Sequence, residues 1–535
     1  MHATSGIIGL GIGLALLFFS SSACGAEGAI ESLKESYRFL VSDRAAQGGA
    51  LYTASAGSLK GRALPLSFGD SAPYWGAYVC RQPGAVCAVT DIYNPADYTL
   101  GPQPGPAGDL QTERVNVHNG ANIYDAAVWQ IAVVLGQVAN RLSVPSGQDA
   151  YDLAGNQNLL LKAGHCGNAT APVSGANRAL THKQMFLYNG TAITDPEQAY
   201  SFRMLGRDWL SDDPFMETPF AALISAASLP RQRPEYRPGK ISWSDWKPIT
   251  GENAWAFLLG PLQAAYLHYV RGRGGAFVPF EDLAVQQALA VLPTFAAMQS
   301  PIGAVYYAPA GTLSNQGTQP VHPHQVSVEN NFSLYAGLNL LRAILRVELA
   351  GEITLSAGEK RTIQRALALI QTMIHGGTLD KHRTTAGLLD FFQHRAWRDG
   401  GFVQGGIANA PNASEAWMPA VEPRAVDANT WGVAALGTRQ IDAWFGIGAS
   451  YNTWQHTKRW GAYGVGTTLW GVGYSNQDGN GLNADGTYRQ GILSAEWTAG
   501  AITMVRNMLR HYRAIAADGK GNPVARPFVE SLEAD

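Results

Sequence analysis

Apolar side chains recur at the three- and four-residue spacing of an α-helix through most of the chain, and this period limits the fold more than any other feature. Strand-like alternation is scarce, although short apolar pieces such as 305–307 fit small hairpins. Gly260-Pro261 should kink its helix, because proline removes a donor and clashes with the preceding turn. We predict helices at Glu31–Leu40, Ala126–Val138, Glu252–Val270, Phe280–Met298, Val328–Leu349, Lys360–Ile374, Asp427–Leu436, Ile441–Trp454 and Leu493–Tyr512.

The order of these helices favours a ring of helix pairs, in which each helix buries one apolar stripe. The connections Gly48–Asn122, Pro145–Thr250 and Gly376–Val426 are too long for a simple bundle. Long connections in a compact domain are usually functional, and here they would wall a cleft over the ring. We therefore predict an all-α fold: an (α/α)6 toroid with long decorating loops and minor β-hairpins. One catalytic domain should span residues 26–515, followed by a poorly ordered tail at 516–535.

The first 25 residues read as a signal peptide. The apolar run Ile7–Phe19 is too short for a bilayer, which needs roughly 20 apolar residues. Ala23 and Gly25 suit a signal-peptidase site, so we expect cleavage near Gly25 or Ala26 and a secreted, extracellular protein. The alternative is a lipid-modified Cys24, but Ser21 stands where that motif usually has an aliphatic residue. No later stretch of the sequence is apolar enough to span a membrane.

Charge and composition argue against a nucleic-acid partner. The formal net charge is −2 and the basic residues are not clustered. Only 15% of residues are charged, whereas 10% are aromatic, with 14 Trp. Such a surface suits an uncharged sugar polymer, whose rings stack on Trp and Tyr, although any single Trp is more often part of the core. We expect a polysaccharide as the partner, no membrane contact in the mature protein, and a monomer.

Cysteines and glycosylation sequons agree with secretion without establishing it. Cys80 and Cys87 lie close together in a Gly/Pro-rich loop and form a plausible disulfide, with Cys166 left free, but pairing with Cys166 stays open. The four sequons begin at Asn168, Asn189, Asn331 and Asn412. A glycoprotein with a disulfide bond is therefore expected.

Acidic residues stand at the beginnings of several apolar helices. If the inner helices of a toroid share one direction, these residues converge on one mouth. The alternative is structural, because such residues also cap helices and offset the macrodipole. The residues concerned are Asp125, Glu252, Glu329, Asp427 and Glu496.

Several acids beside aromatic residues fit glycoside hydrolysis. That reaction needs one carboxyl group that stays protonated and another that is ionised, roughly 6.5–9.5 Å apart when water attacks directly. Zinc-protease, P-loop, paired CxxC and nucleophile-elbow motifs are absent from the sequence. His322 and His324 form an H-x-H pair without further ligands, so we interpret them as loop residues and expect neither a metal nor a cofactor.

Four segments resemble a known enzyme family. They are ENAWAFLLGPLQ at 252–263, VSVENNFSLYAG at 326–337, VDANTWG at 426–432 and LSAEWTA at 493–499. Together they resemble the secreted fungal endo-β-1,2-glucanases of glycoside hydrolase family 162, over about Trp209–Tyr512. More broadly, they are similar to other large (α/α)6 enzymes that act on glycans.

The resemblance implies an inverting endo-hydrolase that cleaves linear β-1,2-glucan to short sophoro-oligosaccharides without a metal. It implies a Glu as general acid, which we place on Glu252, with Glu329 as competitor. It implies an Asp as general base, reaching water through a substrate hydroxyl; we place it on Asp427, with Asp442 as competitor. Substrate contacts are expected from Glu329, Trp255, Tyr335, Trp431, Glu496 and Trp497.

Two other functions stay open. A polysaccharide lyase or unsaturated-glycan hydrolase could use the same toroid; a lyase acting on uronates needs cations and a Tyr or His base. Candidates for those roles are Arg203, Arg207, Arg395, Arg424, His394 and Tyr124. A non-catalytic glycan-binding protein is the second alternative, and it would tolerate amides at Glu252 and Asp427. Linkage specificity does not follow from the residues alone.

Overall fold

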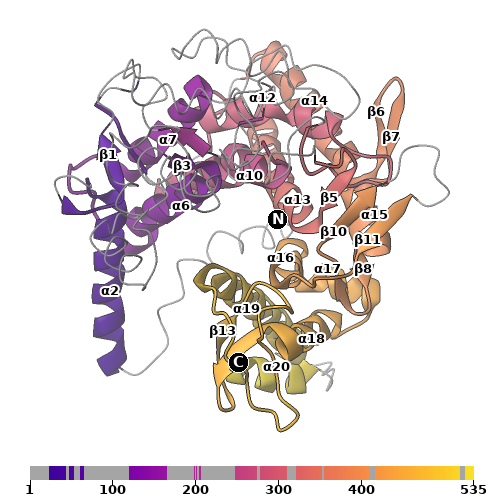
Figure 1. The fold of residues 1–535 in the computed structure, drawn as a ribbon. Coiled ribbons are helices and arrows are strands. Elements are labelled where there is room, and N and C mark those ends of the chain that lie inside the picture. The colour runs from indigo at the N-terminus through magenta and orange to yellow at the C-terminus, as the bar shows by residue number, and fades with distance from the viewer. Residues whose placement is uncertain are drawn as a thin grey trace, which may run out of the picture.

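The structure of the protein is a computed structural model. It covers residues 23–43, 47–53, 59, 61–65, 120–164, 198, 200–201, 204–206, 248–273, 277–309, 321–351, 355–408, 416–517 and 525–535. These residues are mostly helical with short strands, as expected (Figure 1). Several of the residues named above lie outside this part: Cys80, Cys87, Cys166, Asn168, Asn189, Arg203, Arg207 and Asn412.

Five helical rods lie side by side in chain order, and each packs against the next. They are α6 (Ile123–Asn140); the continuous rod α10 (Thr250–Ala254), η5 (Trp255–Leu259), α11 (Gly260–Tyr266) and η6 (Leu267–Gly272); α13 (Val328–Ala350); α16 (Val426–Leu436); and α19 (Ala495–Ala517). Their mutual faces hold buried side chains of one continuous apolar core, including Leu258, Phe332 and Val433.

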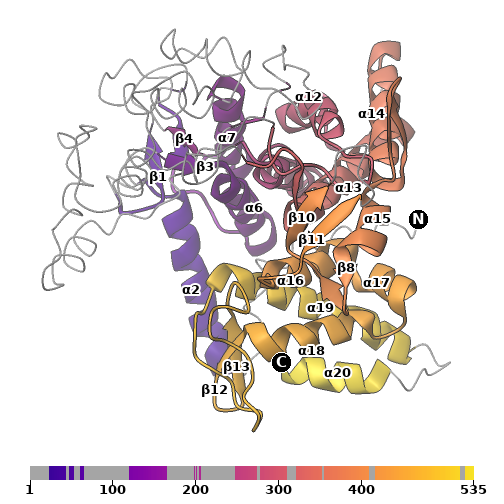
Figure 2. The ribbon, with the colours of Figure 1, turned by 45° about the vertical axis from the view of Figure 1, so that its right-hand side comes forward.

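A second set of helices alternates with these rods along the chain and packs on them. It comprises α7 (Ala150–Gly164), α12 (Leu283–Ala297), α14 (Ala357–His375), α17 (Thr438–Phe445), α18 (Ala449–Gly461) and α20 (Ala525–Ala534). α2 (Ala23–Val41) packs against α6, and the short α15 (Leu388–Phe391) and η7 (Phe392–Ala396) follow α14. Figures 1 and 2 show these elements following one another in an arc. The described residues alternate as helix pairs require, but they do not by themselves show a closed six-pair toroid.

The rod at 250–272 stays helical through Gly260-Pro261, where we expected a kink. Leu259 and Gly260 keep right-handed helical angles, and a π-helical turn, η5, precedes the proline. The wider turn accommodates the proline, which lacks an N–H, without breaking the rod. Gly260 also allows α6 to approach closely, because a Cβ there would lie 2.5 Å from the Cβ of Ala127.

The strands of the described residues are short, and their ladders are antiparallel. β5, β10 and β11 form a three-stranded sheet that leads directly into α13 and toward α16. Residues 305–307, expected in a hairpin, contribute only an isolated bridge from Val305 to Gln299. The strands are β1 (Leu51–Thr53), β2 (Ala63–Pro65), β3 (Gly120–Asn122), β4 (Met204–Gly206), β5 (Gln325–Ser327), β6 (Gly377–Asp380), β7 (Arg383–Thr385), β8 (Trp397–Arg398), β9 (Gly401–Phe402), β10 (Gly405–Ala408), β11 (Trp417–Ala420), β12 (Ala462–Val465) and β13 (Thr468–Val472).

Two expectations near the C-terminal end differ from the structure. The helix expected at Ile441–Trp454 is broken by Gly446 and Gly448, whose φ angles of 97° and 93° lie outside the helical range. Residues 525–534, expected in a poorly ordered tail, form α20. This helix is amphipathic and buries Leu532, and the side chain of Asp535 forms an ion pair with Lys458 at 2.7 Å. Within the described ranges, no helix combines the length and apolar character needed to cross a bilayer.

Candidate active site

The beginnings of all five rods line a single pocket of about 820 Å3. Each rod contributes one carboxyl group to its wall, as expected if the rods share one direction. The acidic residues are Asp125 from α6, Glu252 from α10, Glu329 from α13, Asp427 from α16 and Glu496 from α19. Carboxylates in first turns also face the positive ends of the helix dipoles, which makes their negative charge easier to hold.

Capping does not use all of these acids. At the start of α13, the side chain of Ser327 accepts the N–H of Asn330. At the start of α19, the side chain of Ser494 accepts the N–H of Trp497. The carboxyls of Glu329 and Glu496 are therefore not needed as caps. Asp427 differs, because its carboxylate accepts the N–H of Ala428 at 2.6 Å.

A close approach of two rods brings Glu252 beside the α13 segment that carries Glu329. Gly251 packs so tightly on α13 that a Cβ there would lie 2.3 Å from Oδ1 of Asn330. Glu252, which follows this glycine, lines the pocket and is buried, with 8% of its surface exposed. A small residue at 251 is thus a condition for bringing two carboxyls into one wall.

Ser333 joins the acids to the aromatic wall. Its hydroxyl donates to Oε1 of Glu329 at 2.7 Å, and it accepts the indole N–H groups of Trp255 and Trp431 at 3.1 Å each. Indoles only donate, so both lone pairs of the serine oxygen are used and its single proton must go to Glu329. Any proton held by Glu329 is then on its other oxygen, Oε2.

Aromatic rings form the rest of the wall. Trp255 and Trp431 stack with ring centroids 5.4 Å apart, and the edge of Tyr124 meets Trp255 at 5.1 Å. The hydroxyl of Tyr124 donates to Glu496 at 2.6 Å. Trp129 and Trp497 also line the pocket. Because Trp255 and Trp431 are almost fully buried, they present little of their surface to a ligand.

Two neighbouring carboxyls keep their protons more strongly than usual. Burial, reinforced by the charge of Glu496, raises the pKa of Glu329 to about 7, although the Ser333 hydrogen bond acts in the opposite direction. Burial and then the charge of Glu329 raise the pKa of Asp427 well above its ordinary value. The pair therefore retains a proton into the neutral range. Burial and Glu496 likewise raise the pKa of Tyr124, which stays a donor.

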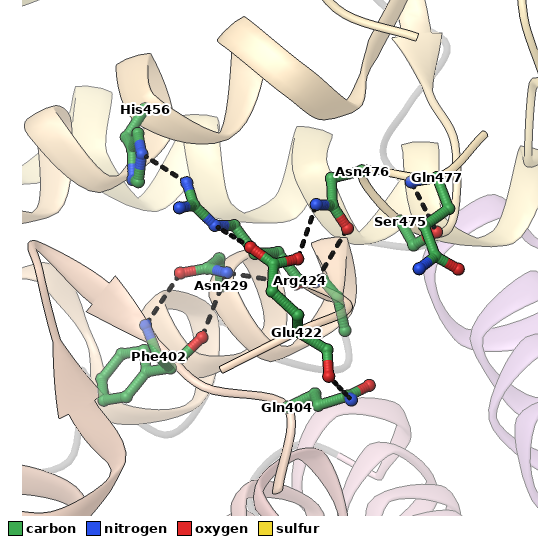
Figure 3. A network of polar contacts seen from close by, with 10 residues as sticks. Phe402, Gln404, Glu422, Arg424, Asn429, His456, Ser475, Asn476 and Gln477 are labelled. Atoms are coloured by element: carbon green, nitrogen blue, oxygen red, sulfur yellow. Dashed lines mark hydrogen bonds and ion pairs between the residues drawn. The ribbon is translucent and has the colours of Figure 1, made fainter. Parts of the chain in front are cut away.

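Cationic side chains are missing from the part of the pocket wall that the structure describes. Arg424 lies in the segment before α16, where it contacts Glu422 at 3.2 Å and His456 at 3.0 Å (Figure 3). Arg395 and His394 do not line the pocket either, whereas Tyr124 does. Of the groups considered for a lyase, only the tyrosine is found in the described wall.

The contacts in Figure 3 fix the position of Asp427 indirectly. Asn429, buried two residues after Asp427 in α16, accepts the N–H of Phe402 at 2.9 Å and donates to the carbonyl of Ala425 at 3.1 Å. Asn476 accepts the N–H of Arg424 at 2.9 Å. These bonds hold the chain on both sides of the residue that carries the carboxylate.

Two candidate residues lie away from the pocket. Tyr335 packs on the core with its edge toward Phe392, because six residues after Glu329 the helix has turned its side chain to another face. Asp442, the competitor for the base, is buried and structural: it accepts the N–H groups of Gly448 and Ser450 and the hydroxyl of Tyr512. Neither is available to a ligand in the pocket.

The sequon at Asn331 is buried. Its side chain is 0% exposed and bonds both the N–H and the carbonyl of Val305, at 2.7 and 3.0 Å. A glycan therefore cannot be accommodated at this position in the folded protein. His322 and His324 lie near each other in a turn, and the described residues contain no group of three or more His, Cys, Asp or Glu arranged to hold a metal ion.

Comparison with known proteins gives one distant structural likeness. No protein-family model and no curated protein sequence matches the chain. A solved structure titled "Crystal structure of sugar epimerase from ruminal bacterium" is similar with a TM-score of 0.33 and 11% sequence identity, over 72% of this chain and 71% of that chain. We draw neither fold nor chemistry from a likeness of this degree.

Proposed function

We propose that this protein is a glycoside hydrolase that cleaves a neutral glucan in the pocket at the starts of the five rods. The observation that carries the proposal is the wall itself, which combines five carboxyls with aromatic rings and has no described cation. Glycoside hydrolysis requires one protonated and one ionised carboxyl close together. The raised pKa values of Glu329 and Asp427 mean that a carboxyl in this wall keeps a proton near neutral pH, which supports acid chemistry there, whereas the placement of the general acid on Glu252 rests on the family resemblance.

In the proposed mechanism, Glu252 protonates the leaving oxygen and Asp427 activates water, as the family resemblance implies. Glu329 carries the retained proton on Oε2 and donates it as a hydrogen bond to the substrate. With Glu329 neutral, one of the charges that raise the pKa of Asp427 is absent. Burial still raises the pKa of Asp427, and the N–H of Ala428, which stabilises the carboxylate, acts in the opposite direction.

The substrate, the stereochemistry and the setting are part of the same proposal. We infer an inverting endo-hydrolase of linear β-1,2-glucan that is secreted, acts as a monomer and closes its helix pairs into an (α/α)6 ring. The resemblance supports this inference, because each of its four segments contributes one pocket carboxyl: Glu252, Glu329, Asp427 and Glu496.

The first experiment incubates the purified full-length chain with linear β-1,2-glucan and follows reducing ends and product length. β-1,3- and β-1,4-glucans serve as comparison substrates, and NMR of the first products gives the anomer. Release of short products from the β-1,2-linked polymer with inverted configuration is expected. Release from another glucan alone would remove the linkage assignment but keep the hydrolase.

The second experiment separates the roles of the acids. Glu252→Gln should abolish cleavage of the polymer but retain it on an oligosaccharide with a dinitrophenyl leaving group, which needs no proton. Asp427→Asn should lose both activities. Glu530→Gln, which removes an exposed carboxylate on α20, is the matched control and should behave as wild type. If Glu329→Gln shows the pattern expected of Glu252→Gln, the acid is Glu329.

A uronate lyase has less support, because its substrate carboxylates would face carboxylates in the described wall. Unsaturated products from a polyuronate would favour it nevertheless, with Tyr124 as base. A non-catalytic binder would keep its full function in both amide variants.

A further inference from the structure

We propose that the β12–β13 hairpin and the chain after it form a second carbohydrate-binding surface, which holds the part of a polysaccharide that extends beyond the pocket. We call this surface the hairpin platform and define it as Tyr463, Trp470 and Tyr474. The inference rests on the proposed action on a glycan, and it names where the long substrate runs.

The hairpin platform exposes aromatic surface that folding would normally bury. Trp470 is 59% exposed and Tyr474 is 44% exposed. The rings of Tyr463 and Trp470 lie 6.5 Å apart with their planes at 51°. Exposed aromatic residues that are grouped rather than scattered usually mark a binding surface. Figure 2 shows the hairpin beside α18, at one edge of the C-terminal helices.

The platform is continuous with the pocket. The ring of Tyr474 meets Trp497, a residue of the pocket wall, edge to face at 5.0 Å. β13 is also bonded to the beginning of α19, because the N–H of Val472 donates to Thr498 at 3.0 Å and Val472 forms a bridge with Ser494. The hairpin is thus fastened to the turn that carries Glu496. Tyr474 follows two residues after the end of β13, the strand that carries Trp470, so one short segment of chain links Trp470 to the ring pair of Tyr474 and Trp497.

The path is held in place before any ligand arrives. The carboxylate of Asp478 accepts the N–H groups of Tyr474 and Ser475, the latter at 2.8 Å. Asn480, which is buried, accepts the N–H groups of Gly491 and Ile492 at 3.0 and 2.9 Å. A surface fixed in this way loses little conformational freedom on binding.

The occupant that fits is a neutral sugar chain. Tyr and Trp offer flat apolar faces with polar edges, which match the apolar face and hydroxyl rim of a pyranose ring. A polymer that is cut in the pocket must leave it along some surface, and this aromatic path begins at the pocket wall. A second copy of this chain is the rival occupant, because Ile492 and Leu493 beside the path are also 45% exposed.

Trp470→Ala tests the platform, with Ile447→Ala as the control. Ile447 is 51% exposed in the turn between α17 and α18 and belongs to neither site. Kinetics are measured on the polymer and on the shortest oligosaccharide that the wild type cleaves. Trp470→Ala should raise KM for the polymer about tenfold, as expected for one lost stacking contact. Its kcat, and both constants for the short substrate, should stay within twofold. Equal effects on both substrates, or none on the polymer, would overturn the proposal.

A binding measurement separates this inference from the proposed hydrolysis. Wild type and both variants are run in native gels that contain one of several neutral polysaccharides, and their sedimentation is measured in parallel. Retardation that Trp470→Ala loses and Ile447→Ala keeps supports the platform, whether or not the polymer is cut. If no polysaccharide retards the wild type, or if wild type is a dimer that Trp470→Ala dissociates, the platform is not a carbohydrate surface.

Discussion

Replacing Glu329 by Gln should make the protein more stable at alkaline pH while removing a pocket carboxyl. The unfolded chain releases the proton of this carboxyl near pH 4.5, whereas the folded protein keeps it to about pH 7. Between these values the folded state binds more protons, so the stability of the wild type falls as pH rises. The glutamine has the shape of the protonated acid and does not ionise, so it escapes this loss.

The size of the effect follows from the two pKa values. The difference between 4.5 and about 7 corresponds to at most about 3 kcal/mol of unfolding free energy above pH 7. Because the residue is partly exposed to the pocket, we expect roughly half of this value after solvent screening. Below pH 4.5 wild type and variant should be equally stable, since both are then neutral at this position.

Urea unfolding of both proteins at pH 4.5 and pH 8 measures the effect. Glu359→Gln is the matched control, because Glu359 also lies in the first turn of its helix but has its pKa lowered by hydrogen bonds with Ser356. Glu359→Gln should therefore destabilise the protein at pH values above the pKa of Glu359 in the unfolded chain. This change in stability is opposite in sign to that expected for Glu329→Gln. A Glu329→Gln variant whose advantage is the same at both pH values would refute the reasoning.

Three further outcomes are expected. Ser333→Ala leaves two buried indole N–H groups without their acceptor and should lower the free energy of unfolding by about 1–3 kcal/mol. It should also raise the pKa of Glu329 further, so the pH at which stability begins to fall should be higher than in the wild type. The hydrogen bonding described would be contradicted if neither the free energy of unfolding nor this pH changed. Lys458→Met leaves the carboxylate of Asp535 without its cation and should lower the free energy of unfolding by about 3–5 kcal/mol, measured as a lower melting temperature. A melting temperature equal to that of the wild type would argue against a structural ion pair. Gly251→Ala should lower stability by about 1–3 kcal/mol and reduce any hydrolysis, because its Cβ meets Asn330; an unchanged variant would show that α10 and α13 adjust freely.

The helices could be predicted because their apolar period is local information. Glu329 and Asp427 could be picked out for the same reason, since a position in the first turn of a helix is visible in the sequence. The convergence of these residues depended on assuming that the inner helices share a direction, and the pocket lining agrees with that assumption.

The choice among similar residues could not be made from the sequence. Asp442 resembles Asp427 until tertiary contacts show that it holds a turn and Tyr512. For Ser333 the sequence offers only its spacing, four residues after Glu329, which places both side chains on the same face of the helix. Its contacts with Trp255 and Trp431 join three separate rods, and no local pattern reports such a meeting.

The buried amide of Asn331 has a consequence for how the protein can be produced. Glycosyltransferases of the secretory pathway act on nascent chains, and this sequon ends in Ser333, whose hydroxyl already has three partners in the core. Val305, which the amide binds, is synthesised 26 residues earlier and is present when Asn331 emerges. A chain modified before these two segments dock would carry a sugar where the fold leaves no room, so the yield in such a host depends on which event comes first.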